Sequence, residues 1–193
     1  MTAFFGPFMG IADYGTYCAA ILLFLALPGP GTFALLTSTG KGGFRAGAAA
    51  TLGLILGDQV LLWLAVAGVA ALLAAYPAVF NMVRWVGAAY LAWIGFKLLL
   101  SKAGESAQPV RIEPGHYARQ AFLITLLNPK AIIFYMAFFP LFIDPAHHQG
   151  LPTFAVMALT IAGITAVYCL TLCAMANAVA QQVRAHQRLA KAL

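Results

Sequence analysis

The sequence predicts an all-α protein, a polytopic bundle of transmembrane helices. Hydrophobic residues make up 63% of the 193 residues, and Asp, Glu, Lys and Arg together only 8%. A soluble domain averages about 25% charged and 45–50% apolar residues, so an ordinary soluble enzyme is excluded. The apolar runs are continuous and not alternating, which disfavours a membrane β-barrel. Helices that cross a membrane are therefore the expected architecture.

Five stretches of the chain are apolar and long enough to span a membrane, since a span needs roughly 20 apolar residues. Polar connections separate them, the longest at residues 101–118, and a basic tail follows at 181–193. We expect one membrane domain over residues 1–193, with a first half at about 14–100 and a second half at about 119–180. The expected spans cover residues 14–40, 46–75, 80–100, 119–143 and 153–180.

The basic residues gather on one side of such a bundle. Five spans place alternate connections on opposite sides, and Arg84 is then alone on one of them. Because cytoplasmic connections are rich in Lys and Arg, we expect the N-terminus outside the cytoplasm and the tail inside it. A cytoplasmic fringe facing anionic lipid explains the net charge of +6 without a nucleic-acid partner. The residues on the expected cytoplasmic side are Lys41, Arg45, Lys97, Lys102, Arg111, Arg119, Arg184, Arg188 and Lys191.

The three cysteines are too few and too scattered for a disulfide framework or a zinc site. Cys169 and Cys173 lie one helical turn apart in an apolar stretch, where free cysteines act as small hydrophobic residues. His147 and His148 follow Asp144, but in a loop and not in a span. No cofactor or metal is therefore expected, although a transporter of metal ions or redox equivalents on this scaffold stays open as an alternative.

Pro28, Gly29 and Pro30 interrupt the first expected span. A proline has no N–H, so Pro28 leaves the carbonyl of Phe24 without its helical donor, and Pro30 does the same for Ala26. In hydrocarbon an unsatisfied carbonyl costs several kcal/mol. Such a break persists only where it is buried in protein or lines a wet cavity.

Asn128, Pro129 and Lys130 interrupt the fourth expected span, and Pro129 frees the carbonyl of Thr125. At 1.5 Å per residue, both breaks and Asp58 lie near the middle of a hydrocarbon core about 30 Å thick. A charge at that depth costs at least ~2.5–3.5 kcal/mol. Asp58 and Lys130 therefore form either a structural pair that neutralises itself or part of a cavity in which Asp58 exchanges a proton.

A GxxxG pair, Gly53 and Gly57, lies in the second expected span. Small residues at this spacing let two helix backbones approach closely. We expect the pair to pack against another helix of the same chain, and dimerisation into a homo-oligomer is the weaker interpretation.

The two breaks occupy corresponding places in the two halves of the chain. Each lies in the first span of its half and is followed by a short turn and a span rich in Gly and Ala. Three spans are an odd number, so a second copy of the first half must insert upside down. An inverted 3+3 repeat with broken helices near the midplane is typical of secondary transporters.

Three segments together resemble the LysE/RhtB group of amino-acid exporters, over roughly residues 14–180. They are PGPGTFALLTSTGKGGFRAGAAATLGLILGD, GAAYLAWIGFKLL and FLITLLNPKAIIFYMAFFPLF. The resemblance implies a six-span protein of the bacterial inner membrane that carries amino acids or close derivatives out of the cell, driven by the proton-motive force. This chain stops at Leu193, where a sixth span would be expected, and the basic tail resembles the loop that leads to it.

The expected function is therefore export of small zwitterions by alternating access, not catalysis. The N-termini of the half-helices would bind a carboxylate, with Lys130 adding a charge. The freed carbonyls of Phe24, Ala26 and Thr125 would accept an ammonium group, and Asp58 is the candidate proton-linked or ammonium-facing acid. A non-transporting membrane assembly partner is the remaining alternative. The candidate substrate and ion site comprises Pro28, Gly29, Pro30, Asp58, Asn128, Pro129 and Lys130.

Overall fold

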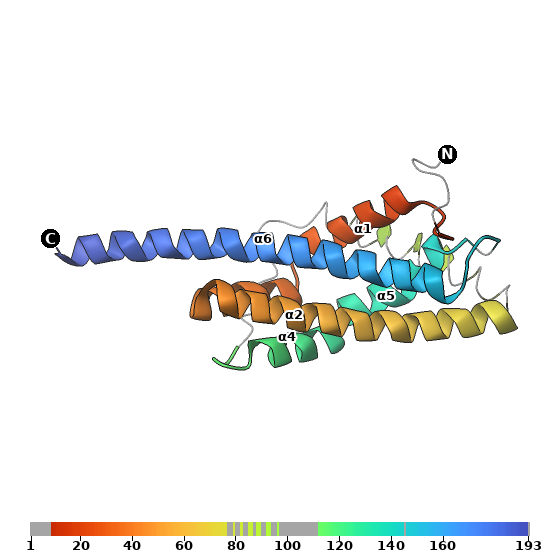
Figure 1. Ribbon diagram of the computed structural model, residues 1–193, viewed down its shortest axis with the longest axis horizontal. Coiled ribbons are helices and arrows are strands. Elements are labelled where there is room, and N and C mark those ends of the chain that lie inside the picture. The colour runs from red at the N-terminus through yellow and green to blue at the C-terminus, as the bar shows by residue number, and fades with distance from the viewer. Residues whose placement is uncertain are drawn as a thin grey trace.

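In the computed structural model, the regular secondary structure of the described residues consists of helices and one isolated β-bridge (Figure 1). It describes residues 9–76, 112–144 and 146–192, together with scattered positions between 79 and 96. The expected third span at 80–100 lies largely outside these residues, as do Arg84, Lys97, Lys102, Arg111 and the side chains of the tail. The helices are α1 (Tyr14–Ala26), α2 (Pro30–Ala75), α4 (Tyr117–Leu126), α5 (Pro129–Phe142) and α6 (Leu151–Ala192).

Helix α1 begins at a side-chain cap. The Asp13 carboxylate accepts hydrogen bonds from the backbone N–H of Thr16 at 3.0 Å and from the Thr16 hydroxyl at 2.9 Å. This satisfies one of the N–H groups that the first turn of a helix leaves without a partner. The helix ends at Ala26 because Pro28 supplies no N–H to continue it.

We expect Asp13→Ala to destabilise the protein by about 1 kcal/mol, because the capping oxygen is lost. Thermal unfolding of the purified protein in detergent measures the effect. Asp13→Asn retains an oxygen in the same place and is the control. Equal losses of stability in the two variants would contradict the capping role.

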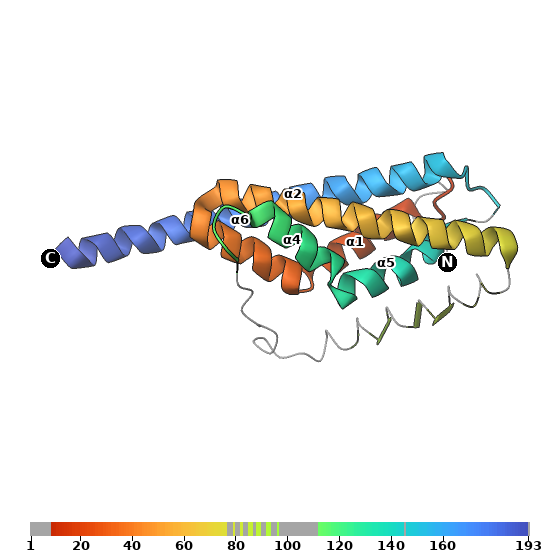
Figure 2. The ribbon, with the colours of Figure 1, turned by 90° about the horizontal axis from the view of Figure 1, so that it is seen from below.

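Helix α2 reverses direction at Gly43. This glycine has φ 70° and ψ −165°, a conformation that residues with a side chain rarely adopt. In Figure 2, the part of α2 before Gly43 lies beside the part after it. Residues 30–42 therefore follow α1 after a short break, and residues 44–75 form a long returning arm. The structure thus has helices over both of the first two expected spans, with the first one interrupted at 27–29.

Helices α4 and α5 form one bent unit. The chain turns by 59° between Leu126 and Pro129, at the break expected from the sequence. By length and composition this pair counts as one candidate membrane span, beside Leu151–Val183 and Pro30–Gly68, the second of which contains the reversal at Gly43. The described helices are therefore those of a multi-pass membrane protein.

Helix α6 extends along the bundle and projects beyond the other helices (Figure 1). Residues 181–192 of the expected basic tail continue α6 to Ala192. No Gly or Pro follows Gly163 in this helix, and its last turns are rich in Ala, Gln, Arg and Leu. These residues have high helix propensity, which explains the continuation.

Two apolar clusters hold the described helices together. Toward one end of the bundle, α1, α5 and α6 pack around stacked aromatic rings, and the Tyr17 hydroxyl donates to the Met157 carbonyl at 2.9 Å. Toward the other end, α2, α4 and α6 pack around Leu35, Leu54 and Cys173. The region between the two clusters contains the helix breaks.

The GxxxG pair lies against α4. A methyl group added at Gly53 would overlap with the carbonyl oxygen of Ala118 and lie 2.8 Å from its carbonyl carbon. At Gly57 it would lie 2.7 Å from the Cβ of Thr125. The expected packing within one chain is thus confirmed, since these glycines let α2 and α4 approach closely.

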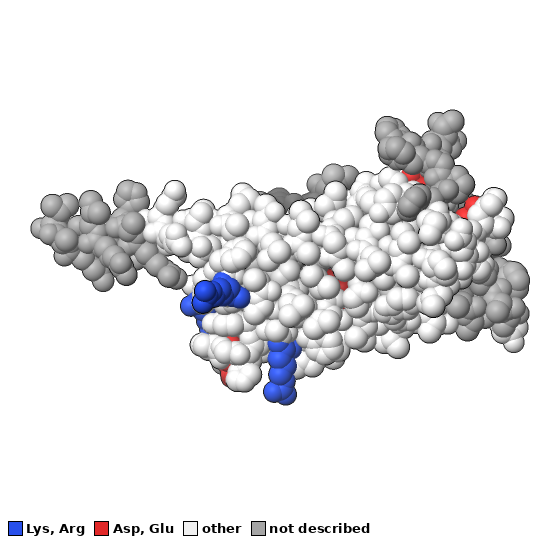
Figure 3. All heavy atoms as spheres, viewed as in Figure 1, with Lys and Arg blue, Asp and Glu red and all other residues white. Residues whose placement is uncertain are grey.

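Charges mark the two ends of the bundle. In Figure 3 the blue side chains gather toward one end of the bundle. Lys41 and Arg45 lie on either side of the reversal of α2 at Gly43, and Arg119 lies in the first turn of α4. Lys41 Nζ donates to the Ile112 carbonyl at 2.7 Å, which ties the connection before α4 to the reversal. The opposite end carries Asp13 and Asp144.

Candidate functional site

The two helix breaks meet at one cavity between the apolar clusters. Its volume is ≈ 60 Å³, and it is partly open to the outside. All five described helices, or the breaks that follow them, contribute to its wall. Most of the lining is apolar, and its polar side chains are Thr32, Asp58, Thr125, Asn128, Lys130, Thr165, Tyr168 and Cys169.

The structure brings four of the seven predicted site residues to this cavity. The four lining residues are Gly29, Asp58, Asn128 and Lys130. The three prolines are exposed and are not part of the wall. Their effect is on the backbone, because each proline ends or begins a helix beside the cavity. The prolines are Pro28, Pro30 and Pro129.

Lys130 connects the start of α5 to the end of α1. Its Nζ donates to the carbonyl of Leu27 at 2.7 Å and to that of Phe24 at 3.4 Å. The same nitrogen lies 4.6 Å from the centroid of the Phe24 ring, which stacks on Phe134 at 3.7 Å. The expectation that the Phe24 carbonyl is free for a substrate is therefore wrong here, because the long Lys130 side chain reaches it first.

The carbonyl of Thr125 is also occupied. It accepts a hydrogen bond from the backbone N–H of Asn128 at 3.1 Å, so the expectation that Pro129 leaves it free is wrong. The cause is a tight last turn of α4. In this turn the N–H of the residue three positions later, Asn128, takes the place of the N–H that Pro129 lacks. The Asn128 side chain then caps the next helix by accepting from the Lys130 N–H at 3.1 Å. Asn-Pro-Lys thus ends one helix and begins another, with Pro129 at a position that needs no N–H.

Two helix N-termini lie at the cavity. Residues Gly31 and Thr32 of the first turn of α2 line it, and so does Ala131 of the first turn of α5. The first turns of helices carry N–H groups without helical acceptors and a partial positive charge. Together with the Lys130 ammonium group, these ends make part of the wall suitable for a carboxylate.

Asp58 is buried in the long arm of α2, with an exposed fraction of 7%. Its side-chain hydrogen-bonding partner is Tyr135 of α5. No ion pair between Asp58 and Lys130 occurs in the described part of the chain, where the recorded pair joins His147 to Asp144. The interpretation of Asp58 and Lys130 as a self-neutralising pair is therefore not supported, and Asp58 faces the cavity with its carboxylate bound to a hydroxyl.

Sequence reasoning missed Thr165. This residue lines the cavity, and its hydroxyl oxygen is enclosed by protein and has no hydrogen-bonding partner in the structure. A threonine in an apolar helix carries no sequence signal, since only the rotation of α6 decides which threonines face inward. Thr171, on the same helix, is exposed and donates to its own helix at 2.8 Å.

The loop between α5 and α6 is a less suitable metal site than the sequence allowed. The His147 Nδ1 lies 2.7 Å from an Asp144 oxygen, while His148 Nδ1 accepts from the Gly150 N–H at 3.3 Å. The backbone N–H of Ala146, followed by the His147 side chain, holds the pKa of Asp144 below its usual value. Within residues 9–76, 112–144 and 146–192, no group of three His, Cys, Asp or Glu side chains is placed to hold a metal.

Comparison with known proteins gives a consistent result. The chain matches the LysE family, described as LysE type translocator, over residues 22–193. It is 36% identical over 187 residues to a leucine efflux protein of Salmonella typhimurium (strain LT2), a match that covers 94% of this chain and 87% of that protein. It is 35% identical over 189 residues to a leucine efflux protein of Klebsiella pneumoniae, with the same shares.

An uncharacterized membrane protein of Pseudomonas aeruginosa is 34% identical over 191 residues, covering 95% of this chain and 88% of that protein. No solved structure matches the chain significantly. The resemblance carried by the three sequence segments is confirmed, and the chain belongs to the LysE family of translocators.

Proposed function

We propose that this protein exports amino acids or close derivatives from the bacterial cytoplasm, across the inner membrane, by alternating access driven by the proton-motive force. Family membership and the names of its leucine efflux relatives support the class of substrate. The observation that carries the proposal is the meeting of two interrupted helices at one largely apolar cavity that also contains an acid and a base.

The cavity offers different chemistry for each part of an amino acid. The substrate carboxylate binds near Lys130 and the helix N-termini at Gly31 and Ala131, where positive charge gathers. When the substrate carboxylate approaches, the Lys130 ammonium group gives up its hydrogen bonds to the carbonyls of Leu27 and Phe24 and donates to the carboxylate instead. An aliphatic side chain lies against the leucine-rich remainder of the wall. The apolar lining suits an amino acid of the leucine type.

Transport follows from the connection that Lys130 makes between the two halves of the chain. Its bonds hold the start of α5, in the second half, against the end of α1, in the first half. Release of these bonds on substrate binding lets the halves move relative to each other, as inverted repeats of secondary transporters do. Asp58 carries the coupled proton, because a buried carboxylate beside a hydroxyl is able to exchange one.

The orientation follows from charge. The end with Lys41, Arg45 and Arg119 faces the cytoplasm and anionic lipid, as cytoplasmic ends usually do. The N-terminus is then outside the cytoplasm.

Export from cells loaded with a panel of amino acids, with and without an uncoupler, tests the proposal. We expect efflux of aliphatic amino acids that the uncoupler abolishes. In Asp58→Asn, efflux falls to the rate seen with uncoupler, because an amide keeps the size of the side chain and one acceptor oxygen but does not bind and release a proton. Asp144→Asn, in an exposed loop outside the cavity, is the control. Uncoupler-sensitive efflux by Asp58→Asn at the parental rate and matched expression would contradict the role of Asp58.

A further inference from the structure

The hydroxyl of Thr165 is anomalous among the threonines of the bundle. Four threonine hydroxyls donate to the carbonyl one turn earlier in their own helix at 2.8–3.0 Å, namely those of Thr39, Thr51, Thr160 and Thr171. Thr16 and Thr153 donate to the Asp13 carboxylate and the Met9 carbonyl instead. Thr165 Oγ1 makes no such bond, although the residue is only 2% exposed. A buried hydroxyl without a partner is unfavourable, so a ligand in the cavity is the natural partner for it.

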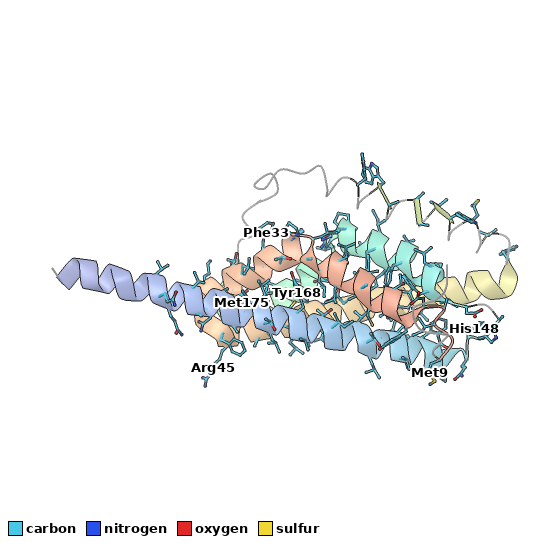
Figure 4. The ribbon with its side chains drawn as sticks, turned by 90° about the horizontal axis from the view of Figure 1, so that it is seen from above. Met9, Phe33, Arg45, His148, Tyr168 and Met175 are labelled. Carbon is cyan, nitrogen blue, oxygen red and sulfur yellow. The ribbon has the colours of Figure 1, made fainter. Side chains whose placement is uncertain are left out.

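Thr165 lies on the side of the cavity where α6 passes Asp58 of α2. Next to Asp58, the Gln59 amide donates to the Ala158 carbonyl of α6 at 3.0 Å and holds the two helices together. One turn beyond Thr165, Cys169 lines the same cavity as Asp58. Tyr168, also in the wall, lies midway along the bundle (Figure 4). The hydroxyl therefore adds an oxygen acceptor to the acidic part of the cavity.

We infer that Thr165 and Asp58 together bind the α-ammonium group of the substrate. This rests on the proposed function and assigns one end of the same site. An ammonium group has three N–H donors and needs several oxygen acceptors in a dry environment. Once Asp58 has released the coupled proton, its carboxylate supplies the charge, and the Thr165 oxygen supplies an acceptor that is otherwise unused. Lys130 and the helix N-termini remain for the carboxylate. A cavity of this kind selects α-amino acids over 2-oxo acids that have the same side chain.

Transport of labelled leucine by the purified full chain in proteoliposomes tests this inference. We expect Thr165→Val to raise the half-saturating leucine concentration by about 10-fold or more, because a hydrogen bond to a charged group is lost. Thr165→Ser restores the hydroxyl and is expected to restore most of the affinity. Thr171→Val, the same change at an exposed position of α6, leaves the affinity unchanged.

Two further measurements separate this role from a structural one. The melting temperature of Thr165→Val is expected to equal or exceed that of the parent, since valine has the same shape and no unsatisfied hydroxyl. The 2-oxo analogue of leucine, 4-methyl-2-oxopentanoate, lacks the ammonium group and should inhibit the parent and Thr165→Val equally.

Leucine affinity within twofold of the parent in Thr165→Val would overturn the inference. An equal loss of affinity for leucine and for its 2-oxo analogue would also overturn it, since the hydroxyl would then serve the carboxylate. Absence of amino-acid transport by the parent would overturn the proposed function itself, and the inference with it.

Discussion

Lys130→Met is expected to reduce export by at least about 10-fold while the chain still inserts into the membrane. Methionine keeps much of the length and apolar stem of lysine but removes the ammonium group that donates to the Leu27 and Phe24 carbonyls. Hydrogen bonds to charged groups contribute about 1.5–3 kcal/mol, so both the connection between α1 and α5 and the carboxylate site weaken. Efflux of preloaded amino acids at matched expression measures the effect.

Two other variants make this result specific to the cavity. Arg119→Gln removes a positive charge from the exposed start of α4 and should export at the parental rate. Lys130→Arg keeps the charge but replaces a compact ammonium group by a planar guanidinium group, so we expect only partial export. Parental export by Lys130→Met would show that the ammonium group takes no part in transport.

Gly53→Ala is expected to prevent close packing of α2 on α4 and to lower both the yield and the melting temperature of the protein. The added methyl group would overlap with the Ala118 backbone carbonyl, which has no rotamer by which to move aside. Overpacking of this kind costs about 1–3 kcal/mol or more. Fluorescence-detected size exclusion over a temperature series in detergent measures the loss.

Gly68→Ala is the matched control for this prediction. It makes the same change in the same helix, but the added methyl group meets no atom within 4 Å. Alanine favours a helix over glycine by about 1 kcal/mol, so stability should stay equal or rise. If Gly53→Ala were as stable as Gly68→Ala, the close approach of α2 and α4 would not be a feature of the folded protein.

Proline and glycine made the helix breaks predictable. A proline supplies no N–H to the preceding turn of a helix, so Pro28 and Pro129 mark the ends of α1 and α4 in the sequence itself, although Pro140 is accommodated inside α5 near its end. The partners of the interrupted backbone were not predictable in this way. Lys130 donates a hydrogen bond to the Phe24 carbonyl, although the two residues are more than 100 positions apart in the sequence. The Asn128 N–H donates to the Thr125 carbonyl within a local turn. The sequence alone could not show either bond, because one depends on packing and the other on the exact turn.

The amino-acid sequence by itself determined that this chain is a bundle of apolar helices with two interruptions and two charges at depth, because composition and the chemistry of proline act locally. Only the tertiary structure decided that the two interruptions share one cavity, that Asp58 faces Tyr135 while Lys130 faces α1, and that Thr165 points inward. The physical reason is that a nearly uniform apolar helix has no strong amphipathic pattern. Its rotation is set by contacts such as those of Gly53 and Gly57 with α4, which exist only once the helices have packed.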